Sequence, residues 1–547
     1  MKNYLLASSL GLLLIFAGCS MKESADAIYY NGKVYTVDSA FSIIESFAVK
    51  DGKIIGVGSN EEVVYRFLSV NKIDLEGRPV YPGFYDAHCH FFGFGSDLVK
   101  CNLIGTKSFD EVIEKVTEYS KTNKFKWLLG RGWDQNDWEK KEFPSNQKLN
   151  SLFPDQPVYL LRIDGHAALC NNAALEKAGI TATTKVNGGI VEQVNGKLTG
   201  ILVDNAVDLV KAVIPPFDEA MNYKALLDAQ KQCFAAGLTS VCDAGLERDT
   251  IDIIEKMQSD GTLKMRINAM VSDAEKNLTY YFGRGPVKTD RLHVSAIKVY
   301  ADGALGSRGA CLIEDYSDQS GHRGFMLRDN AYLADIAKRC NEFGFQMNTH
   351  CIGDSAVRSI LRTYGNELKG KNDKRWRIEH CQVVHPEDIS LFGKYNVIPS
   401  VQPTHATSDM YWVEERLGPE RVKTAYAYND LLKQNKLIAF GTDFPVENIN
   451  PIYTFYAAVA RKDLKNYPEG GYQPENKVSR IDALHAMTTW AAYSCFEEKE
   501  KGMIAPGMFA DFVILSDDLM MSDEDKIPLT KVLATYIGGE RVFEKLP

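Results

Sequence analysis

The chain has 547 residues, of which 45% are hydrophobic and 25% are charged, and these values are typical of a globular protein. They exclude a disordered polymer, a collagen-like fibre and a small disulfide-stabilised domain. A formal net charge of −9 without a basic run argues against a nucleic-acid partner, and a mean hydropathy of −0.23 argues against a multipass membrane protein. The length allows two to four domains, or one large barrel with additions.

The first residues are typical of a secretion signal. A short start with one lysine precedes an apolar stretch from Tyr4 to Phe16, and Ala17-Gly18-Cys19 follow it. The apolar stretch is too short for a comfortable membrane span. Ala-Gly-Cys after such a stretch resembles a bacterial lipobox, with Phe16 in place of the more usual leucine.

This resemblance predicts a lipoprotein signal peptide over residues 1–18, a lipid on Cys19 and a polar tether over residues 19–27. The protein is then exported and lipid-anchored to a bacterial cell membrane, on its periplasmic or surface-facing side. The alternative is ordinary secretion with an incidental cysteine.

Both ends of the remaining chain are rich in short β-like runs. Residues 28–80 contain Asn31-Gly32 and Asp51-Gly52 between apolar runs, and such pairs are hairpin signals. Residues 503–547 have the same pattern. Two β-rich ends around a long α/β middle predict one small β-sandwich that both termini build.

Between these ends, residues 81–502 alternate apolar β-like runs with helix-length connections. Eight such runs can be counted, at residues 80–86, 239–243, 267–271, 294–300, 346–350, 377–380, 397–401 and 437–441. Eight βα units predict an α/β fold with a closed parallel (β/α)8 barrel, the TIM barrel. The first gap is too long for one helix, so residues 101–225 are predicted to form an insertion over the C-terminal face of the barrel, where active sites lie in this architecture.

Side chains that can bind a metal stand at the ends of these predicted strands. His88 and His90 end the first strand, and residues i and i+2 of a strand share one face. An isolated His-x-His is a weak signal. Here further candidates occupy other strands: Lys298 on the fourth, His350 on the fifth, His380 on the sixth and Asp443 after the eighth. All these residues stand at the same end of the predicted strands, and this common position favours a metal site over a scattered set of buried polar groups with hydrogen-bond partners.

Four stretches of the chain also carry a family resemblance. They are Pro82-Gly83-Phe84-Tyr85-Asp86-Ala87-His88-Cys89-His90, Arg162-Ile163-Asp164-Gly165-His166, residues 298–308 and Gly507-Met508-Phe509-Ala510-Asp511-Phe512. This set resembles the amidohydrolase superfamily, a group of metal-dependent hydrolases built on a distorted (β/α)8 barrel. Within it the chain looks similar to the family-3 branch of YtcJ-like and N-substituted formamide deformylase-like proteins.

The resemblance implies a role for each metal candidate. His88 and His90 match ligands of a first metal ion, which they share with Asp443, and His350 and His380 match ligands of a second. Lys298 matches a lysine that is carboxylated in many relatives and bridges the metals. The implied cofactor is a pair of divalent ions, most simply two Zn²⁺, although some relatives work with one. Metal lowers the pKa of water from 15.7 towards about 7, and Asp443 then moves the proton as general base and acid.

Six residues are candidates for substrate binding. Trp133, Arg162 and His166 lie in the insertion, and Asp302 and Arg308 lie in the glycine-rich loop after Lys298. His405 follows the seventh strand. His166 is also a second catalytic candidate, the first to test if Asp443 is not the base. The alternatives are structural: Arg162 pairs with Asp164 to hold a loop, and Asp302 and Arg308 brace Lys298.

Three functions remain open at this point. The first is a metal-dependent hydrolase that cleaves a C–N bond in a small-molecule amide, formamide or cyclic amide. The second is a deaminase of the same superfamily, which the absence of an obvious His-x-x-Glu near the fifth strand disfavours. The third is a lipid-anchored binding or regulatory protein on a non-catalytic barrel. A homodimer stays open as the oligomeric state.

Overall fold

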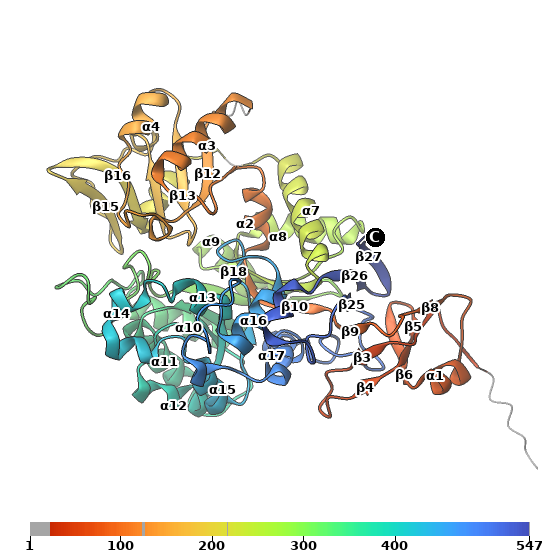
Figure 1. Cartoon of the computed structure of the whole chain (residues 1–547). Helices are drawn as coiled ribbons and strands as arrows, with labels where there is room; N and C mark the ends of the chain where they lie inside the picture. Colours follow the sequence, from red (N-terminus) through yellow and green to blue (C-terminus); the bar gives the residue numbers. More distant parts are fainter. Residues whose placement is uncertain (1–21, 123–125, 216, 546–547) are drawn as a thin grey trace, which may run out of the picture.

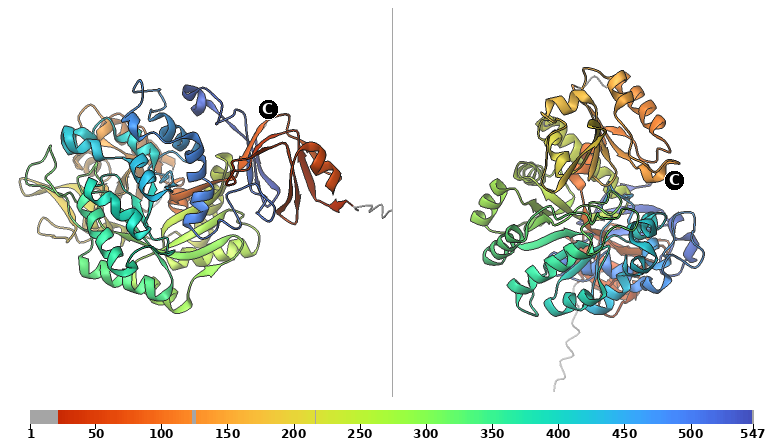
Figure 2. Two further views of the ribbon diagram at one scale, coloured as in Figure 1. Left: turned by 90° about the horizontal axis from the view of Figure 1, so that it is seen from below. Right: turned by 90° about the vertical axis from the view of Figure 1, so that its left-hand side faces the viewer.

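The computed structural model describes residues 22–122, 126–215 and 217–545. Figure 1 shows a helix-covered barrel, a smaller β-rich insertion above it, and a β-sandwich at one side where the first and last strands lie together. Figure 2 shows that the sandwich projects from the barrel and that the insertion covers a different side of it. Within the described ranges, no helix is long and apolar enough to cross a membrane.

The barrel strands follow one another in sequence order. Among the described residues eight parallel strands form it: β10 (Phe84–Cys89), β17 (Leu238–Leu246), β18 (Arg266–Ser272), β20 (Leu292–Tyr300), β21 (Gln346–Cys351), β22 (Arg377–His380), β23 (Ile398–Val401) and β24 (Ala439–Phe440). Almost every residue of these strands is buried, as expected for a parallel sheet covered on both faces. The predicted (β/α)8 barrel is confirmed.

The barrel closes where β24 approaches β10. The backbone N–H of Asp443 donates to the carbonyl of His88 at 2.8 Å. A Cβ atom on Gly441 would lie 2.5 Å from the His88 nitrogen, so only glycine permits this approach. The closure therefore brings Asp443 beside the first pair of predicted ligands.

Helices pack around the outside of the barrel. Those between successive strands are α7 (Glu219–Ala235), α8 (Arg248–Ser259), α9 (Glu275–Arg284), α10 (Asn330–Phe343), α11 (Asp354–Leu368), α12 (Pro386–Tyr395), α13 (Pro403–Asp409), α14 (Val413–Arg421) and α15 (Tyr428–Asn435). After β24 come α16 (Pro451–Ala460), α17 (Arg480–Ala486) and α18 (Thr489–Ser494). In α8 the buried residues Ile251, Ile254 and Met257 recur at helical spacing, which gives the helix one apolar face towards the sheet.

Both termini build the sandwich, as predicted. In the described chain one sheet has the order β6-β5-β2-β8 and the other the order β27-β26-β25-β9-β3-β4. The strands are β2 (Ala27–Tyr30), β3 (Lys33–Tyr35), β4 (Ile43–Ile44), β5 (Ser46–Lys50), β6 (Lys53–Gly58), β8 (Lys72–Asp74), β9 (Pro79–Pro82), β25 (Phe512–Leu515), β26 (Val532–Ile537) and β27 (Glu540–Glu544). Their core contains a stack of Phe512 on Tyr536, with ring centres 4.3 Å apart, and Tyr29 packs edge-on against both rings.

One predicted strand is in fact two. The run at residues 80–86 divides at Gly83, so that β9 pairs with β25 in the sandwich and β10 begins the barrel. A Cβ atom on Gly83 would lie 2.3 Å from the Thr239 hydroxyl, and the glycine thus lets the chain pass closely from one sheet to the other.

The prediction of a polar tether over residues 19–27 is wrong for its second half. β1 (Glu23–Ser24) pairs in parallel with β7 (Phe67–Leu68), which follows α1 (Asn60–Arg66), and Ala25 is buried. Residues 23–27 therefore belong to the fold because their backbone groups find partners there. Cys19 and the predicted signal peptide lie outside the described residues.

The insertion has its own sheet. Its strands in the described residues are β11 (Cys101–Asn102), β12 (Leu128–Trp133), β13 (Val158–Arg162), β14 (Ala167–Cys170), β16 (Lys197–Asp204) and β15 (Gly189–Val194), in this spatial order. Helices α3 (Phe109–Thr122), α4 (Gln147–Leu152), α5 (Asn172–Lys177) and α6 (Asn205–Lys211) belong to it. The predicted boundary at 225 is too late, because α7 packs on β17 and on α2 (Phe91–Asp97) of the barrel.

The sandwich arrangement predicts the effect of a C-terminal truncation. Deleting residues 508–547 removes three strands, including β25 between β9 and β26. Each large apolar side chain lost from the core lowers the free energy of unfolding by about 1.5–3 kcal/mol, and the total free energy of unfolding of a protein is only about 5–15 kcal/mol. We expect insoluble protein. Deleting only residues 540–547, which hold the edge strand β27, is the control and should leave soluble protein; a soluble, active long truncation would contradict the prediction.

Candidate metal centre and active site

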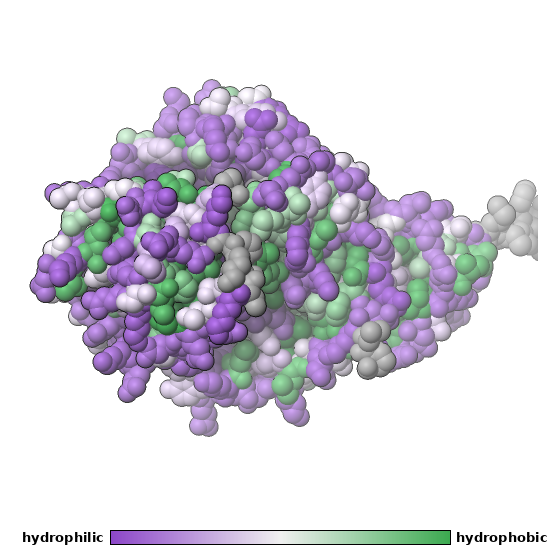
Figure 3. Space-filling model, turned by 90° about the horizontal axis from the view of Figure 1, so that it is seen from above, coloured by the Kyte–Doolittle hydropathy of each residue, from purple (hydrophilic) through white to green (hydrophobic). Residues whose placement is uncertain are grey.

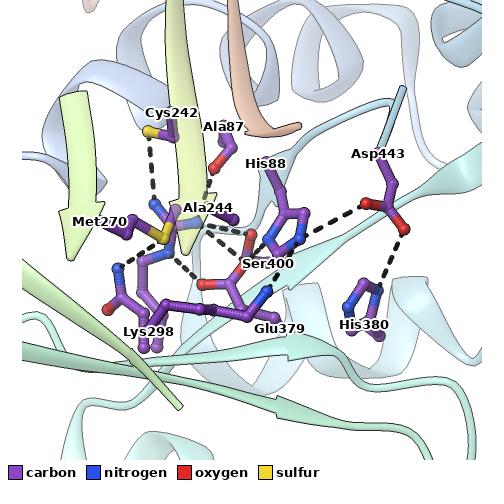
Figure 4. Close-up of polar contacts among 12 residues, drawn as sticks. Ala87, His88, Cys242, Ala244, Met270, Lys298, Glu379, His380, Ser400 and Asp443 are labelled. Carbon is purple, nitrogen blue, oxygen red and sulfur yellow. Dashed lines mark hydrogen bonds and ion pairs between the residues drawn. The ribbon is translucent and has the colours of Figure 1, made fainter. Parts of the chain in front are cut away.

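The predicted metal-binding side chains meet at the C-terminal end of the barrel strands. Figure 4 shows His88, His380, Lys298 and Asp443 converging, with Glu379 beside His88. The His350 and His380 rings have centres 4.5 Å apart, and the His88 and His380 rings 4.8 Å. Five strands or their following loops thus supply one cluster.

Asp443 lies at the middle of this cluster. Its Oδ1 atom is 3.2 Å from His90 Nε2 and 3.5 Å from His88 Nε2. Its Oδ2 atom is 3.7 Å from His405 Nε2 and 4.0 Å from His380 Nδ1. Although burial acts to raise the pKa of Asp443, the contact with His90 holds that pKa well below its ordinary value. Asp443 is therefore an ionised carboxylate between two groups of imidazoles.

Two residues of the cluster have a backbone conformation that residues other than glycine rarely adopt. The φ angles are 77° at His380 and 61° at Asp443. Such residues cost on the order of 1–3 kcal/mol each and persist where the surroundings impose them. Asp86 supplies part of this support, since its carboxylate accepts hydrogen bonds from the Thr442 backbone and hydroxyl at 3.0 and 2.7 Å.

A buried carboxylate fixes the orientation of His88. His88 Nδ1 lies 2.6 Å from Glu379 Oε2, and Arg377 donates to both Glu379 oxygens at 2.7 and 2.9 Å. Burial holds the pKa of His88 well below its ordinary value, so the ring is neutral. Its proton then resides on Nδ1, facing Glu379, and the lone pair of Nε2 faces Asp443.

The other histidines have comparable partners. His90 Nδ1 donates to the carbonyl of Ala244 at 3.1 Å, and His380 Nδ1 donates to Gln402 Oε1 at 2.8 Å. Ligating histidines in proteins usually donate their second ring nitrogen in this way. These contacts leave Nε2 of each ring available for a metal.

The donor set fits divalent metal ions. His88, His90 and Asp443 offer ligand atoms that all lie within 4.8 Å of one another, and so do His380, His405 and Asp443. Asp443 Oδ1 is buried and has no hydrogen-bond donor among the described residues, an expensive state unless a cation neutralises it. His405 is in the second group although it was predicted as a substrate residue. The predicted ligand His350 is outside it, next to His380.

Lys298 is buried against the first group. Its Nζ atom lies 3.3 Å from His88 Nε2 and 4.6 Å from the centre of the Tyr300 ring. Burial lowers its pKa to about 8. In the described part of the chain no carboxylate forms an ion pair with Lys298, and an unpaired ammonium is costly in such a place.

A cavity of about 650 Å³ opens above the cluster, between barrel and insertion. Among its lining residues are Lys298, His350, Tyr300 and, from the insertion, His166. The ring centres of His166 and His350 are 5.0 Å apart, and the Nδ1 atom of His166 is 2.7 Å from Asp204 Oδ1. The predicted catalytic candidate of the insertion thus reaches the metal cluster.

The glycine-rich loop after Lys298 accommodates Asp204. A Cβ atom on Gly303 or Gly309 would lie 2.6 or 2.3 Å from the Asp204 carboxylate. The glycines therefore let this barrel loop pack against the residue that orients His166. These two glycines thus permit a close contact between the insertion and the barrel.

The structure assigns other roles to several predicted substrate residues. Arg162 reaches the cavity wall but is almost fully buried in ion pairs with Asp134 and Asp164, which is the structural alternative. Trp133 lies in the core of the insertion and donates to the carbonyl of Leu160, away from the cavity.

Two further corrections concern the glycine-rich loop. Asp302 is fully buried and accepts backbone hydrogen bonds from Cys311, Ile352 and Gly353 at 2.8–3.0 Å. Arg308 forms an ion pair with Asp318 at 2.8 Å. Neither side chain lines the cavity; they brace the loops around it.

Sequence reasoning missed Glu379 and Asp204. Arg377 and Glu379 are two charges at i and i+2 in a barrel strand, and this pattern could have indicated a buried pair facing the barrel interior. Asp204 carried no comparable signal, because it ends β16, whereas its partner His166 lies 38 positions earlier in the turn between β13 and β14.

The contact behind His88 gives a testable prediction. We expect Glu379→Gln to lower the metal affinity of the centre about 10–100-fold, because the neutral amide replaces the charged carboxylate that accepts from the ring and fixes its orientation. The metal content after dialysis against graded chelator measures this. Glu387→Gln, at an exposed site, is the control. Equal metal affinity in parent and Glu379→Gln, with folding verified by circular dichroism, would show that Glu379 has no such role.

This fold and this site define the class of metal-dependent hydrolases on a (β/α)8 barrel. The model of the Amidohydrolase family matches residues 72–543, and the chain belongs to that family. It is 32% identical over 531 residues to the putative amidohydrolase YtcJ of Bacillus subtilis, with 95% of this chain and 99% of that protein covered. It is 24% identical over 548 residues to the N-substituted formamide deformylase of Arthrobacter pascens, covering 96% and 99% of the two chains.

A solved structure agrees with this membership. The crystal structure of an uncharacterized metal-dependent hydrolase from Pyrococcus horikoshii matches with a TM-score of 0.75 and 28% identity. The match covers 91% of this chain and 99% of that one. The family resemblance predicted from the four sequence stretches is confirmed.

Proposed function

We propose that the protein hydrolyses a C–N bond in a small-molecule amide, formamide or cyclic amide. The position of the Asp443 carboxylate between two groups of imidazoles, at the floor of a cavity, carries this proposal. Membership of the Amidohydrolase family supports hydrolysis in general. The name of the Arthrobacter relative, an N-substituted formamide deformylase, supports an amide-type substrate.

The proposed cofactor is a pair of zinc ions bridged by carboxylated Lys298. His88, His90 and Asp443 would hold one ion, and His380 with His350 or His405 the other. In carboxylation the neutral amine, which the lowered pKa of Lys298 makes accessible, would add to carbon dioxide and release a proton, and a carbamate with two ligand oxygens would replace a buried ammonium. When bound, such metals lower the pKa of water towards about 7 and polarise a carbonyl group.

Two residues of the chain have proposed roles in the reaction. Asp443, ionised and in contact with His90, accepts the proton of the attacking water and returns it to the leaving nitrogen. Although burial acts to lower the pKa of His166, its hydrogen bond to Asp204 raises that pKa, and the protonated ring donates a hydrogen bond from Nε2 to the carbonyl oxygen of the substrate. The insertion covers the site and limits access of bulk water.

The test combines metal analysis with a substrate panel. Protein with its metals bound is incubated with amides, N-substituted formamides, cyclic amides, amino-heterocycles and esters, and products are identified by mass spectrometry. The expected products are a carboxylate and an amine, which are joined in one ring-opened molecule where the substrate is a cyclic amide. Release of ammonia from an amino-heterocycle only would identify a deaminase, and no turnover of any amide would overturn the proposal.

We also propose that Cys19 carries a lipid that anchors the protein to a bacterial membrane. The Ala17-Gly18-Cys19 sequence after the apolar stretch supports this. Cys19→Ala should move the protein from the membrane fraction to the soluble fraction or stall its processing. Unchanged partition with normal maturation would refute the anchor.

A further inference from the structure

Three large apolar side chains are exposed within six consecutive residues at the far end of the sandwich. Tyr65, Leu68 and Val70 have 68%, 60% and 99% of their surfaces exposed. Among the described residues no other stretch of six contains three such side chains, and Val70 is the most exposed of all. We call these three residues the tip cluster. Clustered exposed apolar residues mark interaction surfaces more often than single ones do.

The fold holds the tip cluster in place. The carbonyl of Leu68 accepts a hydrogen bond from the Ala25 N–H, and the carbonyl of Asn71 accepts one from the Ile28 N–H, both at 2.9 Å. Val70 therefore stands on a turn that is hydrogen-bonded on both sides. Its exposure is a property of the folded sandwich.

The N-terminal segment enters the fold beside this cluster. Lys22 Nζ donates to the carbonyl of Val64 at 2.8 Å, and Glu23 of β1 pairs with Phe67 of β7. Cys19 is four positions before Glu23. An extended chain spans at most about 3.3–3.6 Å per residue, so four residues reach no farther than about 14 Å.

A lipid on Cys19 would thus bring the tip cluster to the bilayer. The headgroup region on each side of a bilayer is only about 5–8 Å thick, half the difference between its total and hydrocarbon thickness. We propose that Tyr65, Leu68 and Val70 insert into the interfacial region of the membrane; this inference rests on the proposed anchor. Residues of both charge signs neighbour the cluster along the chain or in β1, namely Lys22, Arg66 and Lys72 as well as Glu23, Glu61 and Glu62. The occupant is therefore the apolar boundary of a bilayer, with no preference for anionic headgroups.

This docking would orient the active site. Figure 1 shows α1, the helix that carries Tyr65, at the end of the sandwich that lies farthest from the insertion, and the cavity lies between insertion and barrel. In the space-filling view of Figure 3, hydrophobic residues interrupt the hydrophilic surface of the sandwich. The cavity then faces away from the membrane, towards water-soluble substrates.

The test places one label at each end of the lipidated full-length protein. Val70→Cys and, as matched control, Val194→Cys are labelled with an environment-sensitive fluorophore; Val194 is 59% exposed on the β15–β16 hairpin of the insertion. The described native cysteines are buried or half-buried, which favours selective labelling. Both proteins are reconstituted into phosphatidylcholine vesicles with and without spin-labelled acyl chains.

We expect the spin-labelled lipid to remove on the order of half or more of the Val70 label fluorescence, since an interfacial side chain lies about 5–10 Å deep. The Val194 label should lose none, and adding phosphatidylglycerol should not increase the quenching. Equal, weak quenching of both labels in protein whose lipid mass is verified would overturn the docking alone. Absence of that mass would overturn anchor and docking together. Neither result bears on the hydrolase activity, which the same samples report separately.

Discussion

Asp443→Asn is expected to lower kcat by about 10²–10⁴, the usual contribution of general acid–base catalysis. Asparagine keeps the shape of the side chain and can still occupy the place beside His90, but it cannot accept a proton. Substrate binding should therefore persist and KM should change much less than kcat. Steady-state kinetics on the best amide of the panel measure this split.

The control for this substitution is Asp208→Asn. Asp208 lines the same cavity, and its side chain is 69% exposed in an ion pair with Lys211. The change removes the same charge without touching the metal cluster, so kcat should stay close to that of the parent. If Asp443→Asn hydrolyses the amide at the parent rate with its metal content unchanged, Asp443 is not the proton acceptor. His166→Asn is then the next variant to measure.

Lys298→Ala is expected to remove metal as well as activity. The lysine is buried beside His88, with its Nζ atom 3.3 Å from the Nε2 atom of that ligand candidate. Loss of a metal forfeits several kcal/mol of charge stabilisation, and each 1.4 kcal/mol is a factor of ten. We expect kcat/KM to fall by about 10²–10³ and the metal content per chain to decrease.

Short carboxylates provide a specific readout for this variant. Formate or acetate can enter the space left by the lysine and supply the two oxygens of the proposed carbamate, so part of the activity should return with increasing concentration. Lys211→Ala, which removes a half-exposed lysine of the cavity wall, is the control. Its metal content and activity should equal those of the parent, and added formate or acetate should not change them. A Lys298→Ala protein with full metal content and full activity would exclude the bridging role.

The local sequence was sufficient to predict the barrel and most of its rim. Buried parallel strands are continuous apolar runs, and helix-length connections separate them, so eight βα units can be counted without knowing their contacts. The ends of such strands meet at one face, and this alone brings His88, His350, His380 and Asp443 together. The hairpin signals at both termini likewise indicated the sandwich.

Only the tertiary structure decided which strand ends and supporting residues serve the site. Gly83 divides one apolar run between two sheets because of its contact with Thr239, which no local pattern encodes. The acceptor behind His88 is Glu379, 291 positions away, and the partner of His166 is Asp204, 38 positions away at the end of β16. Asp302 and Arg308 occur in a family-like stretch and Trp133 in the predicted insertion, yet their packing contacts direct all three side chains away from the cavity. Strand periodicity fixes where a side chain can point, whereas the partner that it meets depends on contacts between distant segments, which form only when the whole chain folds.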